Sequence, residues 1–179
     1  DHGEVALKLL RDDLAKNSRV VERLRQEARA TALVKHPGVV AIHECSHDGE
    51  TVFIAMELLQ GQSLGSRLRD KGALGAAAAV KIARQIAEVL VAVHSANITH
   101  RDLKPDNVFL TTDAAGDEHV RLLDFGIAKL RERNMVAPDL TMPTEILGSP
   151  SYMAPEQCIP GAKIVSSADL YSLGVTLFH

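Results

Sequence analysis

The sequence predicts an α+β fold in two parts, a small β-rich part over residues 1–58 and a mainly helical part over residues 59–179. Two strand-like apolar runs, at 39–46 and 51–58, flank a turn that contains the pair Asp48-Gly49, which is typical of a hairpin. A longer run near the middle of the chain instead repeats its apolar residues every three or four positions, which is helical spacing. Hydrophobic residues make up 46% of the chain, enough for a packed core.

The first part is predicted to run strand, helix, strand, strand. Residues 5–10 form an apolar run typical of a strand, and residues 18–34 carry apolar side chains at helical spacing. We expect Ser18 to cap the start of this helix and Pro37-Gly38 to end it. The hairpin described above follows, which completes the order β-α-β-β.

The second part follows the polar segment Gln60-Gly61-Gln62-Ser63, which we expect to act as a hinge. A helix is predicted at 76–95, with one apolar face made of Ile82, Ile86, Val89, Leu90 and Val93. Short strands are expected between residues 97 and 130, and a last helix from Ser167 onward. Residues 131–163 have little periodicity and carry five prolines, which indicates a functional loop.

Both ends of the chain lie close to predicted elements. The chain opens a few residues before the first strand and closes inside the apolar run 170–179, without a capping residue. We therefore expect a fragment truncated at both ends, which folds poorly or is inactive by itself because its last apolar helix has too little to cover it.

Charge and cysteine content narrow the function classes. Twenty Lys and Arg against 23 Asp and Glu give a net charge of −3, so no basic surface for nucleic acid is expected. Two cysteines, Cys45 and Cys158, are too few for a disulfide framework and favour a reducing, cytoplasmic compartment. The longest apolar stretch, at 73–80, is far too short for a membrane span, so no membrane segment is expected in this chain. These observations are also compatible with a full-length protein that is anchored in a membrane and has this part on the cytoplasmic side.

Four motifs carry most of the functional signal. In chain order they are Val5-Ala6-Leu7-Lys8, the run HRDLKPDN from His100 to Asn107, Asp124-Phe125-Gly126 and Ala154-Pro155-Glu156. Together they resemble the signature set of protein kinases. With the flanking segment 148–157 they are similar to bacterial eukaryotic-like (Hanks-type) serine/threonine protein kinases, and the resemblance covers essentially the whole chain.

This resemblance implies a two-lobed, protein-kinase-like fold, with 1–58 as a partial N-lobe and 59–179 as a partial C-lobe. It implies transfer of the γ-phosphate of ATP to Ser or Thr hydroxyls of protein substrates, with ATP and Mg²⁺ as cofactors. The Gly-rich loop of the family precedes the Lys8 strand, and further helices follow the last one here, so both are expected to be missing from this chain.

Phosphoryl transfer requires compensation of negative charge, ligands for Mg²⁺ and a carboxylate beside the attacking hydroxyl. Asp124 and Asn107 offer the hard oxygen ligands that Mg²⁺ prefers. The resemblance places Asp102 as the group that accepts or orients the hydroxyl proton. It places Lys104, two residues further on, beside the transferred phosphate.

Lys8 resembles the lysine that holds the α- and β-phosphates, and Glu27 resembles its ion-pair partner. Without the downstream motifs, an ordinary solvated lysine and glutamate would be the simpler interpretation. The resemblance also implies that His100 packs against the ring of Phe125 and transfers no proton. Asp169 resembles the aspartate that holds the backbone of the catalytic loop.

The resemblance further implies an adenine pocket between the two parts. Ala6 would line it from above and Phe109 from below, with Met56 at its back. The backbone C=O of Glu57 and the backbone N–H of Leu59 would bind the base. In a cofactor cleft such apolar residues serve packing and binding together.

Regulation by phosphorylation is expected because Arg101 precedes Asp102, and kinases with this arginine usually depend on a phosphate in the loop before the Ala-Pro-Glu motif. Thr141 and Thr144 are the expected acceptors, phosphorylated by a second kinase molecule through self-association. Ser149 is expected to be occupied with the catalytic loop instead.

Alternatives stay open at this point. One is a pseudokinase or non-catalytic scaffold, and another is a small-molecule phosphotransferase of the same fold, although such enzymes normally lack the Ala-Pro-Glu segment. A third concerns His43, Cys45 and His47, whose alternation on a strand resembles a zinc site. That set lacks an obvious fourth ligand, so an ordinary strand is favoured.

Overall fold

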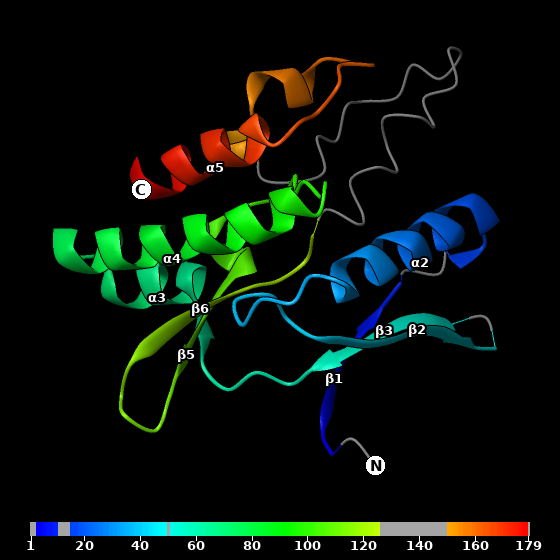
Figure 1. Ribbon diagram of the computed structural model, residues 1–179, viewed down its shortest axis with the longest axis horizontal. Helices are drawn as coiled ribbons and strands as arrows, with labels where there is room; N and C mark the ends of the chain where they lie inside the picture. Colours follow the sequence, from blue (N-terminus) through cyan, green and yellow to red (C-terminus); the bar gives the residue numbers. More distant parts are fainter. Residues whose placement is uncertain (1–2, 11–14, 50, 126–149, 179) are drawn as a thin grey trace.

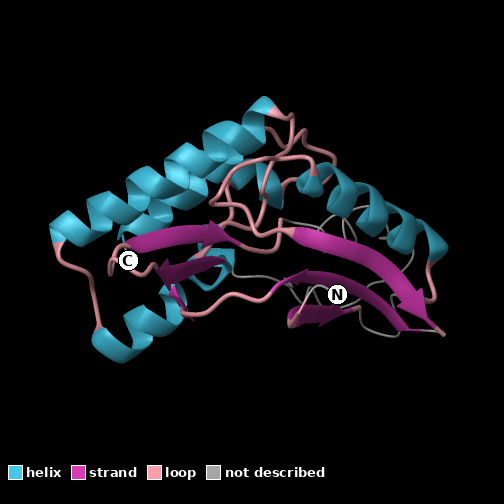
Figure 2. Ribbon diagram, turned by 60° about the horizontal axis from the view of Figure 1, so that its bottom comes forward, coloured by secondary structure: helices cyan, strands magenta, loops and turns pink. Residues whose placement is uncertain are grey.

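The structure is a computed structural model that describes residues 3–10, 15–49, 51–125 and 150–178, without the side chains of Arg19, Arg23 and Glu27. It contains two three-stranded sheets, with strand orders β1-β3-β2 and β4-β5-β6 (Figure 1). Figure 2 shows the longest helices on one side of the layer of strands. The α+β class expected from the sequence is confirmed.

The first sheet and its helix consist of β1 Val5–Leu9, α2 Ser18–Ala32, β2 Ile42–Asp48 and β3 Thr51–Glu57. Both strand pairs are antiparallel. The buried face of α2 packs on the sheet through a small apolar core of Leu24, Ala28, Val52 and Ile54. The predicted order β-α-β-β is therefore correct.

Two details of this part differ from the prediction. The cap of α2 is Asn17, whose Oδ1 accepts a hydrogen bond from the amide of Val20 at 3.3 Å, whereas Ser18 is already helical. The second strand begins at Ile42 and not at residue 39, because Val39 forms a parallel bridge with Leu122 of the second sheet. The backbone at this point thus joins the two sheets.

The second part contains β4 Gln62–Ser63, α3 Leu64–Lys71, α4 Ala76–Ser95, β5 Val108–Thr112, β6 Glu118–Leu122 and α5 Ser167–Phe178, with short 3₁₀ turns at Pro105–Asn107, Pro150–Tyr152 and Pro155–Cys158. The expected apolar face of α4 is its buried face. It packs with Leu103, Val108, Leu122 and Phe125 into the main hydrophobic core.

The sequence did not predict α3, and half of the expected hinge is a strand. Ser63 caps α3 by accepting a hydrogen bond from the amide of Ser66 at 3.0 Å. Gln62 and Ser63 pair with β5, which leaves 58–61 as the link between the sheets. The division at residue 58 remains a prediction. Among the described residues, no helix combines the length and the apolar character needed to cross a membrane.

Candidate active site

Lys8 and Asp124 meet between the two sheets. Lys8 lies on β1 opposite Ile54, and Asp124 follows the end of β6. The ammonium Nζ of Lys8 donates to Oδ1 of Asp124 at 2.5 Å. The two side chains are 41% and 39% exposed, so water screens the pair and reaches the site. Asp124 has a φ of 52°, a strained backbone conformation of the kind that concentrates at functional sites.

Asp102 and Asn107 form the second polar pair. The buried amide Nδ2 of Asn107 donates to the backbone O of Asp102 at 2.7 Å and to its Oδ2 at 3.2 Å. This orientation leaves Oδ1 of Asn107 as an oxygen ligand. The backbone O of Asn107 also accepts from the amide of Leu123 at 2.9 Å, which ties this loop to the strand that leads to Asp124.

The buried carboxylate of Asp169 holds the loop that carries Asp102. Its Oδ2 accepts from the amide of His100 and its Oδ1 from the amide of Arg101, both at 2.8 Å. These are the backbone contacts that the resemblance implied. Arg101 has a φ of 64°, so the carboxylate stabilises a strained turn directly before Asp102.

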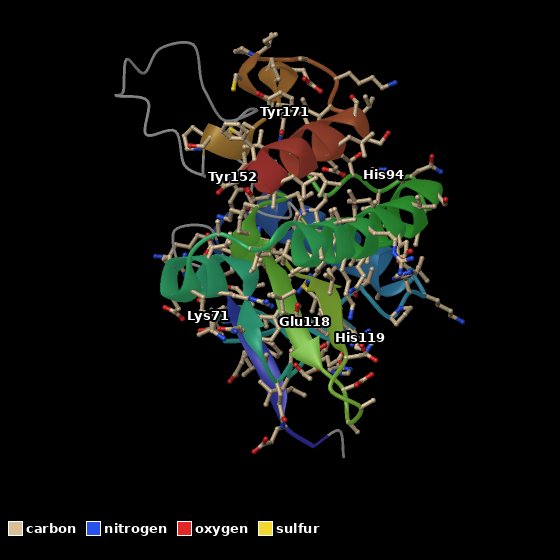
Figure 3. All side chains as sticks on the ribbon, turned by 90° about the vertical axis from the view of Figure 1, so that its left-hand side faces the viewer. Lys71, His94, Glu118, His119, Tyr152 and Tyr171 are labelled. Carbon is tan, nitrogen blue, oxygen red and sulfur yellow. The ribbon has the colours of Figure 1, made fainter. Side chains whose placement is uncertain are left out.

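His94 is a third partner of Asp169 that sequence reasoning missed. Its Nε2 lies 2.7 Å from Oδ2 of Asp169, and Figure 3 shows His94 between α4 and α5. Its position in the last turn of α4, just before the HRD motif, was the available signal. Gln157 was missed as well; its Nε2 donates to the backbone O of Arg101 at 2.8 Å.

His100 is fully buried. Its Nε2 lies 2.9 Å from the backbone O of Leu123, and its ring centroid is 4.8 Å from that of Phe125, as expected. Burial lowers the pKa of His100 below the ordinary value, against the opposing attraction of Asp169 and Asp102. The imidazole is therefore a neutral packing group and not a proton carrier.

The residues expected at the adenine pocket come from both sheets and from the segment that links them. Ala6 pairs with Met56 across β1 and β3, and Phe109 lies on β5 opposite Arg121. Glu57 ends β3, and the amide of Leu59 donates to no other described residue. The structure thus places Ala6 beside Met56, with the hinge directly after them.

The structure shows few or no contacts for the remaining expected site residues. Lys104 is half-buried at the start of the 3₁₀ turn after Asp102, and no ion pair links it to another described residue. The side chain of Glu27 lies outside the described part, although its backbone is in α2. Thr141, Thr144 and Ser149 also lie outside the described residues.

The zinc-like set on β2 is not assembled into a site. Among the described residues, no group of three or more His, Cys, Asp or Glu side chains is placed to hold a metal ion. His47 instead contacts Arg25, with 3.1 Å between Nδ1 and Nη2. Cys45 packs against the core under α2, and burial raises the pKa of its thiol.

Comparison with known proteins gives one consistent result. The family model of the protein kinase domain matches residues 1–179. The chain is 41% identical over 176 residues to the serine/threonine-protein kinase pkn2 of Myxococcus xanthus, covering 98% of this chain and 21% of that protein. It is 38% identical over 181 residues to the serine/threonine-protein kinase PkaB of Streptomyces coelicolor, covering 99% of this chain and 42% of that protein. The chain therefore spans between a fifth and about two fifths of the length of these two relatives.

The fold is similar to that of a solved structure, the PknI kinase domain of Mycobacterium tuberculosis. The TM-score is 0.75 with 29% sequence identity, and the match covers 98% of this chain and 62% of that one.

Proposed function

The chain belongs to the protein kinase domain family, and from this premise we propose that it transfers the γ-phosphate of ATP to Ser and Thr hydroxyls of protein substrates. Protein kinases as a family use ATP and Mg²⁺. The observation that carries the proposal is the convergence of Lys8, Asp124, Asn107 and Asp102 from distant parts of the sequence. A non-catalytic scaffold would not need this complete set.

The donor set fits a magnesium nucleotide. Asp124 and Asn107 supply carboxylate and amide oxygens, which suit a hard cation that takes its remaining ligands from water and phosphate. When bound, Mg²⁺ neutralises charge on the phosphates. Lys8 adds a cation beside Asp124 and is suited to hold the α- and β-phosphates. Glu27 is proposed as the second partner of Lys8.

Asp102 and Lys104 are proposed to act on the transferred group. Asp102 accepts the proton of the substrate hydroxyl while the oxygen of that hydroxyl bonds to the γ-phosphorus. The bond between the γ-phosphorus and the oxygen that bridges it to the β-phosphate breaks, and its electron pair leaves with ADP. Asn107 holds the Asp102 carboxylate in place. Lys104 places a positive charge on the transferred phosphate and leaves room for a short hydroxyl side chain.

The hinge is proposed to bind adenine through backbone groups, the C=O of Glu57 and the N–H of Leu59. Ala6, Met56 and Phe109 are proposed to enclose the base. All three side chains are half-buried, as expected for apolar residues that line a cleft.

Regulation is proposed to act through Arg101. The buried Nε of Arg101 has no hydrogen-bond partner among the residues that the structure describes, and a buried donor of this kind favours an added acceptor such as a phosphate. Phosphorylation of Thr141 or Thr144 by a second copy would supply it, and Ser149 is proposed to interact with the catalytic loop instead. A cytoplasmic position fits these protein substrates, and an anchor elsewhere in the full-length protein would be compatible with it.

Incubation of the complete gene product with radiolabelled Mg-ATP tests the proposal. A generic protein substrate should gain acid-stable phosphate on Ser and Thr, and a panel of small alcohols should gain none. Lys8→Met should abolish transfer. Lys81→Met is the matched control, because Lys81 forms a well-exposed surface pair with Asp117. Transfer to small alcohols alone would support the phosphotransferase alternative, and ATP binding without any transfer would support the scaffold.

A further inference from the structure

We propose that Glu57 and Arg121 form a clamp between the two sheets that sets the affinity for ATP. The inference rests on the proposed function, because it assigns the clamp to the same nucleotide site. Glu57 is the last residue of β3 in the first sheet, and Arg121 lies on β6 in the second. An Nη2–Oε2 ion pair joins them across 64 residues of sequence.

Backbone contacts surround this ion pair. Oε2 of Glu57 also accepts from the amide of Ala41 at 3.3 Å, and the amide of Glu57 donates to the O of Ala41 at 2.9 Å. Next to Arg121, the amide of Leu122 donates to the O of Gly38 at 2.7 Å. These contacts hold together the segment 38–41, the end of β3 and β6.

The position of the clamp links the two ends of the proposed nucleotide site. The backbone C=O of Glu57 is the proposed adenine contact, so its side chain is available for a different task. Arg121 lies opposite Phe109 on β5 and three residues before Asp124. The ion pair therefore fixes the hinge relative to Phe109, which is proposed to line the adenine pocket from below, and relative to Asp124, the proposed metal ligand.

Because the ion pair is largely buried, loss of either side chain should disturb the structure around the other. The side chains of Arg121 and Glu57 are only 19% and 34% exposed, and within the described part of the chain the buried Nε of Arg121 has no hydrogen-bond partner. Removal of the carboxylate would leave a largely buried guanidinium without its counter-charge, and the side chain would have to move. Such movement would displace β6 relative to the hinge.

The test compares this ion pair with a second one of the same burial. Arg67 of α3 and Glu118 of β6 form an ion pair with 21% and 31% exposed side chains, but within the second part of the chain. Glu118, labelled in Figure 3, is the first residue of β6 and pairs with Thr112 at the turn end of the β5–β6 hairpin. The variants Glu57→Gln, Arg121→Met and their combination are made in the complete gene product. Arg67→Met and Glu118→Gln serve as controls.

Each clamp substitution should raise KM for ATP about fivefold with kcat within about twofold of the parent. The combined variant should be no worse than either single one, because both changes break the same contact. Calorimetry with a non-hydrolysable ATP analogue should show the same loss of affinity, and Arg121→Lys should stay within about twofold of the parent. The control substitutions should leave KM for ATP unchanged while lowering the melting temperature to a similar degree.

Unchanged or lowered KM in both clamp variants would overturn the clamp, and so would multiplying effects in the combined variant or equal effects in the controls. If the parent enzyme phosphorylates protein while these results fail, only the clamp is wrong. If the parent binds no ATP, the proposed function fails and the clamp fails with it.

Discussion

Nζ of Lys8 and Oδ1 of Asp124 lie 2.5 Å apart although 116 positions separate them in the sequence. Since both side chains are well over a third exposed, the ion pair adds little to the free energy of folding. Its importance is one of position, because an ammonium group suited to phosphate and a carboxylate suited to a metal ion are held at the same point between two sheets.

Asp124→Ala should remove the dependence of nucleotide binding on Mg²⁺. The reason is that a proposed metal ligand is lost while Lys8 stays available to the phosphates. Calorimetric titration with ATP, with and without Mg²⁺, measures this; affinities for Mg-ATP equal to those of the parent would contradict the metal role. Asp117→Asn is the matched control, because Asp117 is an exposed aspartate in a surface pair with Lys81.

Asp102→Asn should lower kcat by about 10²–10⁴-fold, the range typical of a general base. ATP binding should persist, since Asp102 is not assigned to the nucleotide and an amide preserves the size of the side chain. Steady-state rates together with ATP affinity separate the two effects. A rate equal to that of the parent would exclude Asp102 as the proton acceptor.

Asp169→Asn should lower kcat and leave KM for ATP nearly unchanged. An amide cannot accept all three hydrogen bonds that the carboxylate receives from the amides of His100 and Arg101 and from His94. An unsatisfied buried group costs about 1–3 kcal/mol, which would lower kcat about fivefold to 160-fold if it were expressed in the transition state.

His94→Leu should produce a smaller loss of the same kind, because the two amides still hold Asp169. His94→Gln, which retains a donor, should recover part of the rate. If His94→Leu instead changes KM for ATP without changing kcat, His94 does not act through the loop that carries Asp102.

Stability should fall on acidification below about pH 6.5 because of His100. Burial lowers its folded-state pKa below the ordinary value of 6.5, so the unfolded chain binds more protons in that range. The contribution is therefore present above the unfolded pKa and is lost as the pH falls towards the folded pKa, by up to about 1.4 kcal/mol per pH unit. Urea unfolding at pH 7.5 and pH 5.5 should show a larger loss for the parent than for His100→Phe; equal losses would show that another group dominates.

Phosphate should appear on Thr141 or Thr144 after incubation of the complete gene product with Mg-ATP. The double variant Thr141→Ala/Thr144→Ala should then be slower than the parent, because Arg101 would lack its anionic partner. Mass spectrometry and initial rates measure the two effects. Full activity without phosphate on either threonine would exclude this mode of regulation.

The sequence alone determined the local structure and the chemical inventory. The apolar face of 76–95, the order β-α-β-β and the motifs at Lys8, Asp102 and Asp124 were all readable, because helical and strand periodicity depends on near neighbours in the chain. The sequence did not show which of two neighbouring polar residues caps a helix, nor did it reveal a short polar helix. Asn17 and not Ser18 caps α2, and the short polar helix α3 has too little periodicity to be recognised.

The tertiary structure decided which of these residues meet. The contacts of Asp169 with His94, of Arg101 with Gln157 and of Glu57 with Arg121 join positions 75, 56 and 64 residues apart. No periodicity records such contacts, because they depend on how whole helices and strands pack against each other. The motif residues and Asp169 were therefore visible in the sequence, whereas the supporting contacts made by His94, Gln157 and Arg121 could be identified only in the folded chain.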